Sequence, residues 1–179
     1  MEKGGKNFER RYERRYLPEF VYGGIDGAVT TFAVVAGVIG ASLSPAIVLI
    51  LGFANLFADG FSMAISDYLS IKSENELDKK HRKNARKKAL ATFFSFVIIG
   101  VIPLLSFVVA AIFRSEFFIK NQFILSIFFT IFALLFVGWN KGKITGKSKI
   151  RSSINTLLIG GTAAILAFLV GFFVKGLLI

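Results

Sequence analysis

Apolar residues along the chain are grouped into five long runs that short polar segments separate. The runs cover residues 20–43, 46–71, 89–113, 123–139 and 154–174. Each run reaches or approaches the ~20 residues that an α-helix needs to cross a hydrocarbon core of ~30 Å. A helix satisfies its backbone hydrogen bonds internally, whereas lipid can satisfy none of them. The pattern therefore predicts an all-α integral membrane protein with five transmembrane helices.

The polar segments fit a single membrane domain over residues 1–179. Residues 1–19 are charged and lack the apolar stretch of a cleavable signal. The short "SLSP" connection predicts a tight antiparallel hairpin of the first two helices, and residues 72–88 form a short basic linker that should prolong the second helix by a turn or more. Pro103 predicts a kink in the third helix. The run 123–139 has no charged residue, which predicts a lipid-facing peripheral helix.

Composition supports a membrane protein, and the positions of the charges set its orientation. Hydrophobic residues make up 54% of the chain, above the ~45–50% of soluble domains. The net charge is +11, yet all basic residues except Arg114, Lys120 and Lys175 lie in the N-terminal tail and in the second and fourth connections. Five helices place these segments on one side, which the positive-inside rule assigns to the cytoplasm. The N-terminus is then cytoplasmic and the C-terminus outside, and the loops should attract anionic lipid rather than nucleic acid.

The second run carries polar side chains at a helical spacing. Asn55, Asp59, Met63 and Asp67 recur at every fourth position. Four residues turn a helix by about 400°, so these side chains form one slowly winding stripe. An aspartate at the centre of a membrane helix costs ~2.5–3.5 kcal/mol on insertion scales. Two carboxylates in one span are therefore expected to have a binding partner, to face an aqueous cavity or to serve a function.

The first run adds a third carboxylate, Asp26, and the hairpin should bring Met63 and Asp67 to a similar depth. No lysine or arginine lies within any run, so a cation is the expected partner of these acids. Oxygen ligands alone suit magnesium, calcium or manganese, and a thioether shifts the preference toward later divalent metals such as ferrous iron. Met63 can equally be an ordinary core residue, and Asp67 can be solvated near the headgroups.

Small residues at every fourth position mark helix faces that allow close approach. The first run has Gly23 and Gly27 at this spacing, followed further along by Gly37. Such a face can pack within one chain or form a homodimer, and both readings stay open. The chain has no cysteine, and no nucleophile–base pair or phosphate-binding loop is evident, so an enzyme is not predicted.

Four stretches together resemble the vacuolar iron transporter family. They are "GGIDGAVTTFAVVAGVIGASLSP", "LGFANLFADGFSMAISDYLSIKSE", "ALATFFSFVIIGVIPLLSF" and "KGKITGKSKIRSSINTLLIGGTAAILAFLVG". The resemblance implies a homodimer whose central path is lined by the first two helices of each subunit. It also implies that Fe²⁺ or Mn²⁺ is the transported substrate, that protons are the coupling ion and that no resident cofactor is needed. Asp26 and Met63 match the path aspartate and methionine of the family.

Two departures from the family pattern concern the metal path and its entrance. Plant and parasite relatives have a glutamate at the position of Asn55 and a glycine at that of Asp59, so the carboxylate stands one turn closer to the cytoplasm here. Those relatives also carry a long cytoplasmic metal-binding domain between the second and third helices, which the short linker lacks. Glu74 and Glu76 in that region could form a weak entry site or simply a solvated charged face.

The sequence therefore predicts a transporter that exports ferrous iron or manganese from the cytosol by proton antiport and so serves metal homeostasis. The expected location is the cell membrane of a prokaryote, or the vacuolar membrane in a eukaryote. Two other functions fit the residues. One is a channel or transporter for a different cation, and the other is a non-transporting membrane scaffold whose basic loops bind lipid.

Overall fold

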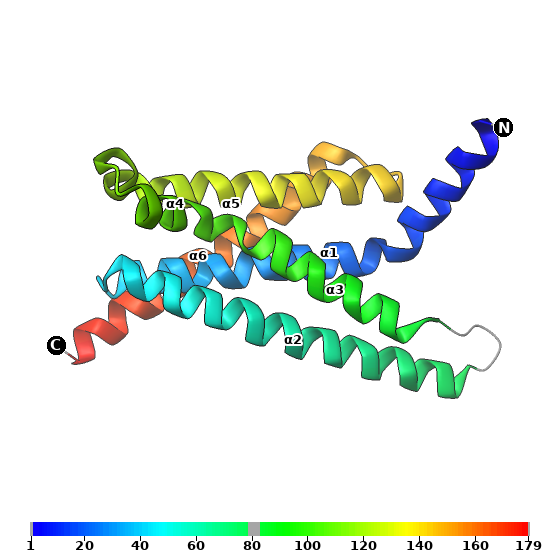
Figure 1. The fold of residues 1–179 in the computed structure, drawn as a ribbon, viewed down its shortest axis with the longest axis horizontal. Helices are drawn as coiled ribbons and strands as arrows, with labels where there is room; N and C mark the ends of the chain where they lie inside the picture. Colours follow the sequence, from blue (N-terminus) through cyan, green and yellow to red (C-terminus); the bar gives the residue numbers. More distant parts are fainter. Residues whose placement is uncertain (1, 79–82, 179) are drawn as a thin grey trace.

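The computed structural model describes residues 2–78 and 83–178, apart from the side chains of 2–14 and 178. Every regular element in these residues is helical (Figure 1). The elements are α1 (Glu2–Gly40), α2 (Pro45–Leu77), α3 (Ala85–Gly100), the 3₁₀ helix η1 (Ile102–Leu104), α4 (Leu105–Phe113), α5 (Glu116–Thr145) and α6 (Lys149–Leu178). Five helical segments are long and apolar enough to cross a membrane, with α3, η1 and α4 forming one of them. The predicted all-α fold with five spanning helices is confirmed.

The helices extend beyond the apolar runs from which they were predicted. α2 continues from the expected end at residue 71 to Leu77, and α5 covers Glu116–Thr145 instead of 123–139. α1 begins at Glu2, so the described part of the charged tail is helical rather than separate from the first span. Hydropathy marks only the part of a helix that lies in hydrocarbon. The backbone hydrogen bonds of the helix continue into the flanking turns, whose charged side chains reach water.

Pro103 interrupts the third span, as predicted. α3 ends at Gly100, η1 contains Pro103, and α4 begins at Leu105. Proline has no backbone N–H and its ring clashes with the preceding turn, so the α-helical ladder cannot run through this position. The Ser126 hydroxyl of α5 donates a hydrogen bond of 2.6 Å to the Pro103 carbonyl oxygen, which ties the bend to its neighbour.

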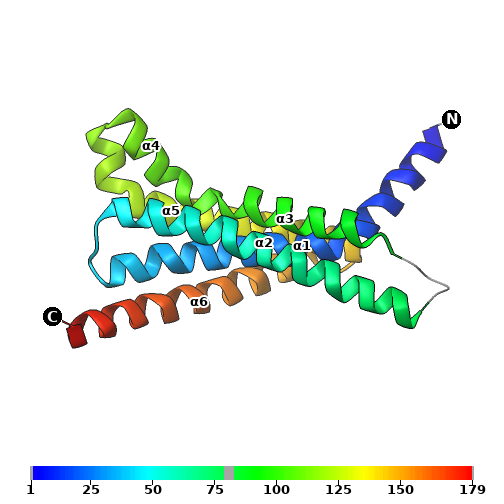
Figure 2. The same cartoon turned by 60° about the horizontal axis from the view of Figure 1, so that its bottom comes forward.

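α1 is the central helix and packs against every other spanning segment, most extensively against α3 and α6. Successive spans run in opposite directions (Figures 1 and 2). The N-terminus, the α2–α3 connection and the α5–α6 turn therefore lie toward one end of the bundle (Figure 1). The C-terminus, the α1–α2 turn and the α4–α5 turn lie toward the other. The described residues of the three basic segments thus share one end, as the charge pattern predicted, and Lys79, Lys80 and Arg82 lie outside the described residues.

α6 is the most peripheral spanning helix, whereas α5, which was expected to face lipid at residues 123–139, exposes one face and buries the other. Only 6% of the most apolar window of α6 is buried, against 33% for α5. The buried residues of α5 are Ser126, Thr130, Ala133, Leu134, Val137, Gly138 and Gly142. Small and hydroxyl-bearing side chains let α5 approach its neighbours. The absence of charge, on which the prediction relied, does not distinguish a buried helix from a lipid-facing one.

The glycines of α1 pack against other helices of the same chain. A Cβ at Gly23 would stand 2.6 Å from the Thr92 carbonyl oxygen, and one at Gly27 would overlap the backbone of Phe96. Both contacts are with α3. Gly37 lies against Gly171 of α6, where an added Cβ would meet the Gly37 backbone. Of the two readings of this small-residue face, packing within one chain is the one that the structure shows.

Replacing Gly27 with alanine is expected to lower the free energy of unfolding by about 1–3 kcal/mol, because the new methyl group overlaps helix backbone that cannot rotate away. Gly161→Ala is the matched control, since a Cβ there meets nothing within 4 Å and alanine favours a helix over glycine. Thermal unfolding in detergent measures both variants. Equal melting temperatures for Gly27→Ala and Gly161→Ala would contradict the packing described here.

Candidate functional site

The polar stripe of α2 lies along the edge of the face that packs against α3. Asn55, Asp59 and Asp67 are half-buried, and Met63 is 8% exposed. The fully packed face of the helix is formed mainly by Val48, Gly52, Leu56, Gly60, Ala64 and Ile71. The stripe therefore occupies the boundary between the helix interface and the open side of the bundle, with Met63 deepest in the interface.

Two members of the stripe have partners on α3. The Thr92 hydroxyl, which is fully buried, donates a hydrogen bond of 2.8 Å to Asp67 Oδ2. Met63 lies in an apolar cluster with Leu56 and Phe96. Asp67 is thus part of a helix–helix contact in the single chain, and Met63 packs as a core residue there.

Asp26 of α1 is half-buried. The Thr30 hydroxyl donates to the backbone oxygen of Asp26 at 2.8 Å, not to its carboxylate. With Tyr22, Val29 and Ile159 among its neighbours, Asp26 lines a shallow concavity of about 360 Å³ between α1 and α6. The acid is therefore accessible from a face that is otherwise apolar.

Asp26 and Asp59 lie within electrostatic range of each other. The sequence placed Asp67 rather than Asp59 at the depth of Asp26, whereas the electrostatic interaction of Asp26 is with Asp59. Neither Asp26 nor Asp59 forms an ion pair with the residues that the structure describes. Like charges repel each other more strongly where the dielectric constant is low. The pair is consequently suited to hold a cation or a proton.

One chain alone does not enclose a metal ion with these acids. Within residues 2–78 and 83–178, no three histidine, cysteine, aspartate or glutamate side chains gather closely enough to hold one. The stripe is bordered on its open side by small residues at every fourth position, all of them exposed: Ala54, Ala58, Ser62, Ser66 and Ser70. A face of this kind allows another helix to approach closely.

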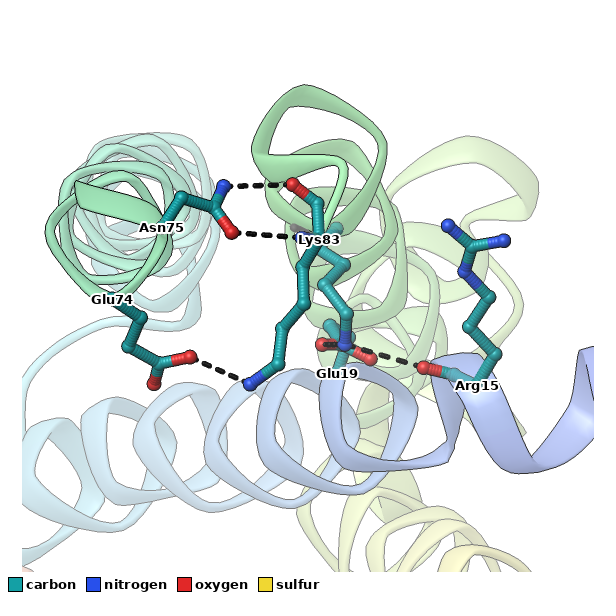
Figure 3. A network of polar contacts seen from close by, with 6 residues as sticks. Arg15, Glu19, Glu74, Asn75 and Lys83 are labelled. Carbon is teal, nitrogen blue, oxygen red and sulfur yellow. Dashed lines mark hydrogen bonds and ion pairs between the residues drawn. The ribbon is translucent and has the colours of Figure 1, made fainter. Parts of the chain in front are cut away.

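The predicted entry residues lie at the end of α2, and the structure gives one of them a partner. Glu74 is exposed and its Oε2 accepts a hydrogen bond of 2.6 Å from Lys83 Nζ (Figure 3). This bond raises the pKa of Lys83. The side chain of Asn75 donates to the Lys83 carbonyl at 2.8 Å and accepts from its N–H at 2.7 Å, which fixes the start of the return to α3. Glu76 is exposed.

A buried ion pair between α1 and α3 was missed by the sequence reasoning. Lys88 Nζ donates to Glu19 Oε1 and, at 3.2 Å, to the Arg15 carbonyl oxygen (Figure 3). Glu19 is 5% exposed and Lys88 9% exposed. A signal for the pair is present in the chain, because Glu19 and Lys88 each stand one residue before an apolar run. α1 and α3 run parallel, so these two positions come to the same depth.

Comparison with known proteins identifies relatives over most of the chain. The model of the VIT family matches residues 17–88 and 78–172. The vacuolar iron transporter of Plasmodium berghei (strain Anka) is 25% identical over 228 residues, covering 91% of this chain and 84% of the relative. Vacuolar iron transporter homolog 4 of Arabidopsis thaliana is 30% identical over 178 residues, covering 92% and 86%.

The Plasmodium alignment is longer than this chain, whereas the Arabidopsis alignment is not. The Plasmodium alignment spans 228 positions, more than the 179 residues of this chain, so that relative has segments without a counterpart here. The two stretches that the family model matches overlap at residues 78–88, around the connection between α2 and α3. A short form of the same architecture accounts for both observations. The chain belongs to the VIT family.

Proposed function

We propose that this protein is a membrane transporter that exports ferrous iron or manganese from the cytosol in exchange for protons. The observation that carries the proposal is the pair Asp26 and Asp59, two acids within electrostatic range of each other on spanning helices and without an ion pair among the described residues. Acidic side chains in a span typically mark an ion pathway or a proton relay. Of the relatives cited above, one is named a vacuolar iron transporter and the other a vacuolar iron transporter homolog.

In this proposal the end of the bundle with the N-terminus, the α2–α3 connection and the α5–α6 turn faces the cytoplasm. That end carries the basic segments, and basic loops are retained on the cytoplasmic side during insertion. The C-terminus is then outside. The cell membrane of a prokaryote, or the vacuolar membrane of a eukaryote, fits export from the cytosol, and anionic lipid is the expected partner of the basic loops.

A homodimer completes the pathway in this proposal. A single chain offers too few ligands to enclose a metal ion among its described residues, and a second copy doubles the available donors. The exposed stripe from Ala54 to Ser70 gives the second copy a face for close approach. Asp26, Asp59 and Asn55 of both copies then line the path. Met63 supplies a thioether one turn from Asp59, and Asp67 lies one turn further toward the cytoplasm.

Proton coupling follows from competition for the same oxygen atoms. A carboxylate that binds a metal ion must be deprotonated, so binding of the metal releases protons and protonation releases the metal. Export therefore proceeds when Asp26 and Asp59 bind the metal from the cytoplasmic side and accept protons from the outside. Glu74 and Glu76 would act as a weak entry site, with the Lys83 ammonium holding Glu74 until a cation arrives.

Metal uptake into proteoliposomes tests this proposal. We expect purified protein to carry Fe²⁺ or Mn²⁺ across the membrane faster than Co²⁺ or Mg²⁺. The metal flux should rise when the proton gradient drives protons in the direction opposite to the metal, and it should fall when a protonophore collapses that gradient. Flux that follows only the metal's own gradient would indicate a channel. Absence of flux for every ion would favour a scaffold with lipid-binding loops.

A further inference from the structure

The turn between α5 and α6 is a rigid corner in which the two helices touch through their backbones. A Cβ at Gly138 would stand 2.6 Å from Ser153 Cα, and one at Gly142 would stand 2.7 Å from Lys149 Cα. Gly146, at a φ of 71°, ends α5 in the left-handed conformation that glycine adopts without strain. The backbone positions that carry the surrounding side chains are therefore held at a fixed spacing.

Outside the close contact, the corner contains a concavity of about 490 Å³. It is lined by Lys141, Lys147, Ser148, Arg151, Ser152 and Asn155. Three cations, two hydroxyls and one amide thus converge on one space, and each of these groups can donate hydrogen bonds. Such a set of donors matches the oxygen atoms of a phosphate group, which arginine and lysine bind through charge-assisted hydrogen bonds.

The cations of this pocket have no acidic counterpart among the residues that the structure describes. None of the three forms an ion pair with a residue that the structure describes, and the sequence has no aspartate or glutamate after Glu116. At the neighbouring α2–α3 connection, by contrast, Lys83 is paired with Glu74 and Lys88 with Glu19. The corner therefore presents positive charge that an external anion can neutralise.

An aromatic residue indicates the depth of the pocket in the membrane. Lys149 Nζ lies 5.2 Å from the ring centroid of Trp139, a cation–π contact at the same corner. Tryptophan concentrates at the level of the lipid headgroups. From the donor set, the unpaired charge and this depth, we infer that the pocket at the α5–α6 corner binds the phosphate group of an anionic phospholipid. The site does not rest on the proposed transport activity.

The single tryptophan of the chain allows a direct test. The purified protein is placed in mixed micelles with phosphatidylglycerol or phosphatidylcholine that carries brominated acyl chains, and quenching of Trp139 fluorescence is recorded against the mole fraction of brominated lipid. We expect phosphatidylglycerol to quench at a several-fold lower mole fraction. Losing a hydrogen bond between a cationic side chain and the phosphate removes an interaction of ~1.5–3 kcal/mol, so Lys147→Gln and Arg151→Gln should each reduce this preference by about tenfold.

Lys143→Gln and Lys120→Gln are the matched controls. Lys143 belongs to the same end of α5 but does not line the pocket, and Lys120 lies at the opposite end of the bundle. Both should retain the preference, and the melting temperature of every variant should equal that of the wild type. Equal quenching by the two lipids, or an undiminished preference in the Lys147→Gln/Arg151→Gln double variant, would overturn the inference.

Inorganic phosphate distinguishes a lipid site from a site for a soluble anion. If the pocket holds a lipid headgroup, millimolar phosphate should leave the preference for phosphatidylglycerol largely unchanged at constant ionic strength. If phosphate removes that preference and also shifts Trp139 emission in micelles of phosphatidylcholine alone, the ligand is the free anion and the assignment to a lipid is wrong.

Discussion

Replacing Asp26 or Asp59 with alanine is expected to lower proton-driven Fe²⁺ uptake into proteoliposomes by at least about tenfold. Each carboxylate is a candidate ligand for the metal and a candidate proton carrier, so its loss affects both halves of the exchange. Losing one interaction with a charged group costs ~1.5–3 kcal/mol, which corresponds to a factor of about 10 or more. Uptake is measured with a metal-sensitive dye in the lumen at a fixed pH gradient.

The control for these variants removes a carboxylate that lies outside the stripe. Glu116 is exposed at the start of α5, and Glu116→Gln should leave uptake unchanged. Wild-type uptake in both Asp26→Ala and Asp59→Ala would refute the proposed pathway. Reduced protein incorporation would be a separate effect, so uptake is normalised to the amount of protein in the liposomes.

The exchange at Asn55 and Asp59 that the family resemblance implies suggests a sharper variant of this experiment. The Asp59→Asn/Asn55→Asp double substitution moves the carboxylate one turn along the same face of α2 without changing the number of charges. We expect it to recover part of the uptake that Asp59→Asn loses and to change the ratio of Fe²⁺ to Mn²⁺ transport. A double variant as inactive as Asp59→Asn would show that the depth of the carboxylate is essential.

Replacing Lys88 with methionine is expected to lower the free energy of unfolding by about 3–5 kcal/mol. The substitution leaves Glu19 buried without its counter-charge, and breaking a buried ion pair from one side has a cost of that size. Oε2 of Glu19 already lacks a hydrogen-bond partner, so Lys88 provides the stabilisation of this carboxylate. Thermal unfolding in detergent measures the effect.

The neighbouring Lys87 provides the matched control. It is exposed and contributes only its backbone N–H, which the Asn84 side chain caps at 3.0 Å, so Lys87→Met should unfold close to the wild-type temperature. Replacing both members of the pair, as in Glu19→Leu/Lys88→Met, should recover most of the stability because no charge is then left buried. A Lys88→Met melting temperature equal to that of Lys87→Met would show that the pair does not stabilise the fold.

Much of the architecture was predictable from the chain alone. The length and apolarity of the runs predict five spanning helices, because only a helix satisfies its backbone in lipid. Alternation of direction then places the basic segments at one end, and the spacing of Asn55, Asp59, Met63 and Asp67 places them on one stripe. Pro103 predicts the break in the third span. These features depend on hydropathy, on helical periodicity or on one residue's geometry, all of which are local.

The choice of neighbours was decided only by the tertiary structure. The sequence predicted a hairpin of the first two helices but not which helices α1 approaches most closely. Gly23 and Gly27 admit the backbone of α3, and Gly37 admits that of α6. The same packing places Thr92 beside Asp67, sets Met63 among apolar side chains and joins Glu19 to Lys88. Lipid is as apolar as the side chains it touches, so hydropathy cannot select between these contacts. Close approach at small residues selects them, and it depends on the surfaces of two helices at once.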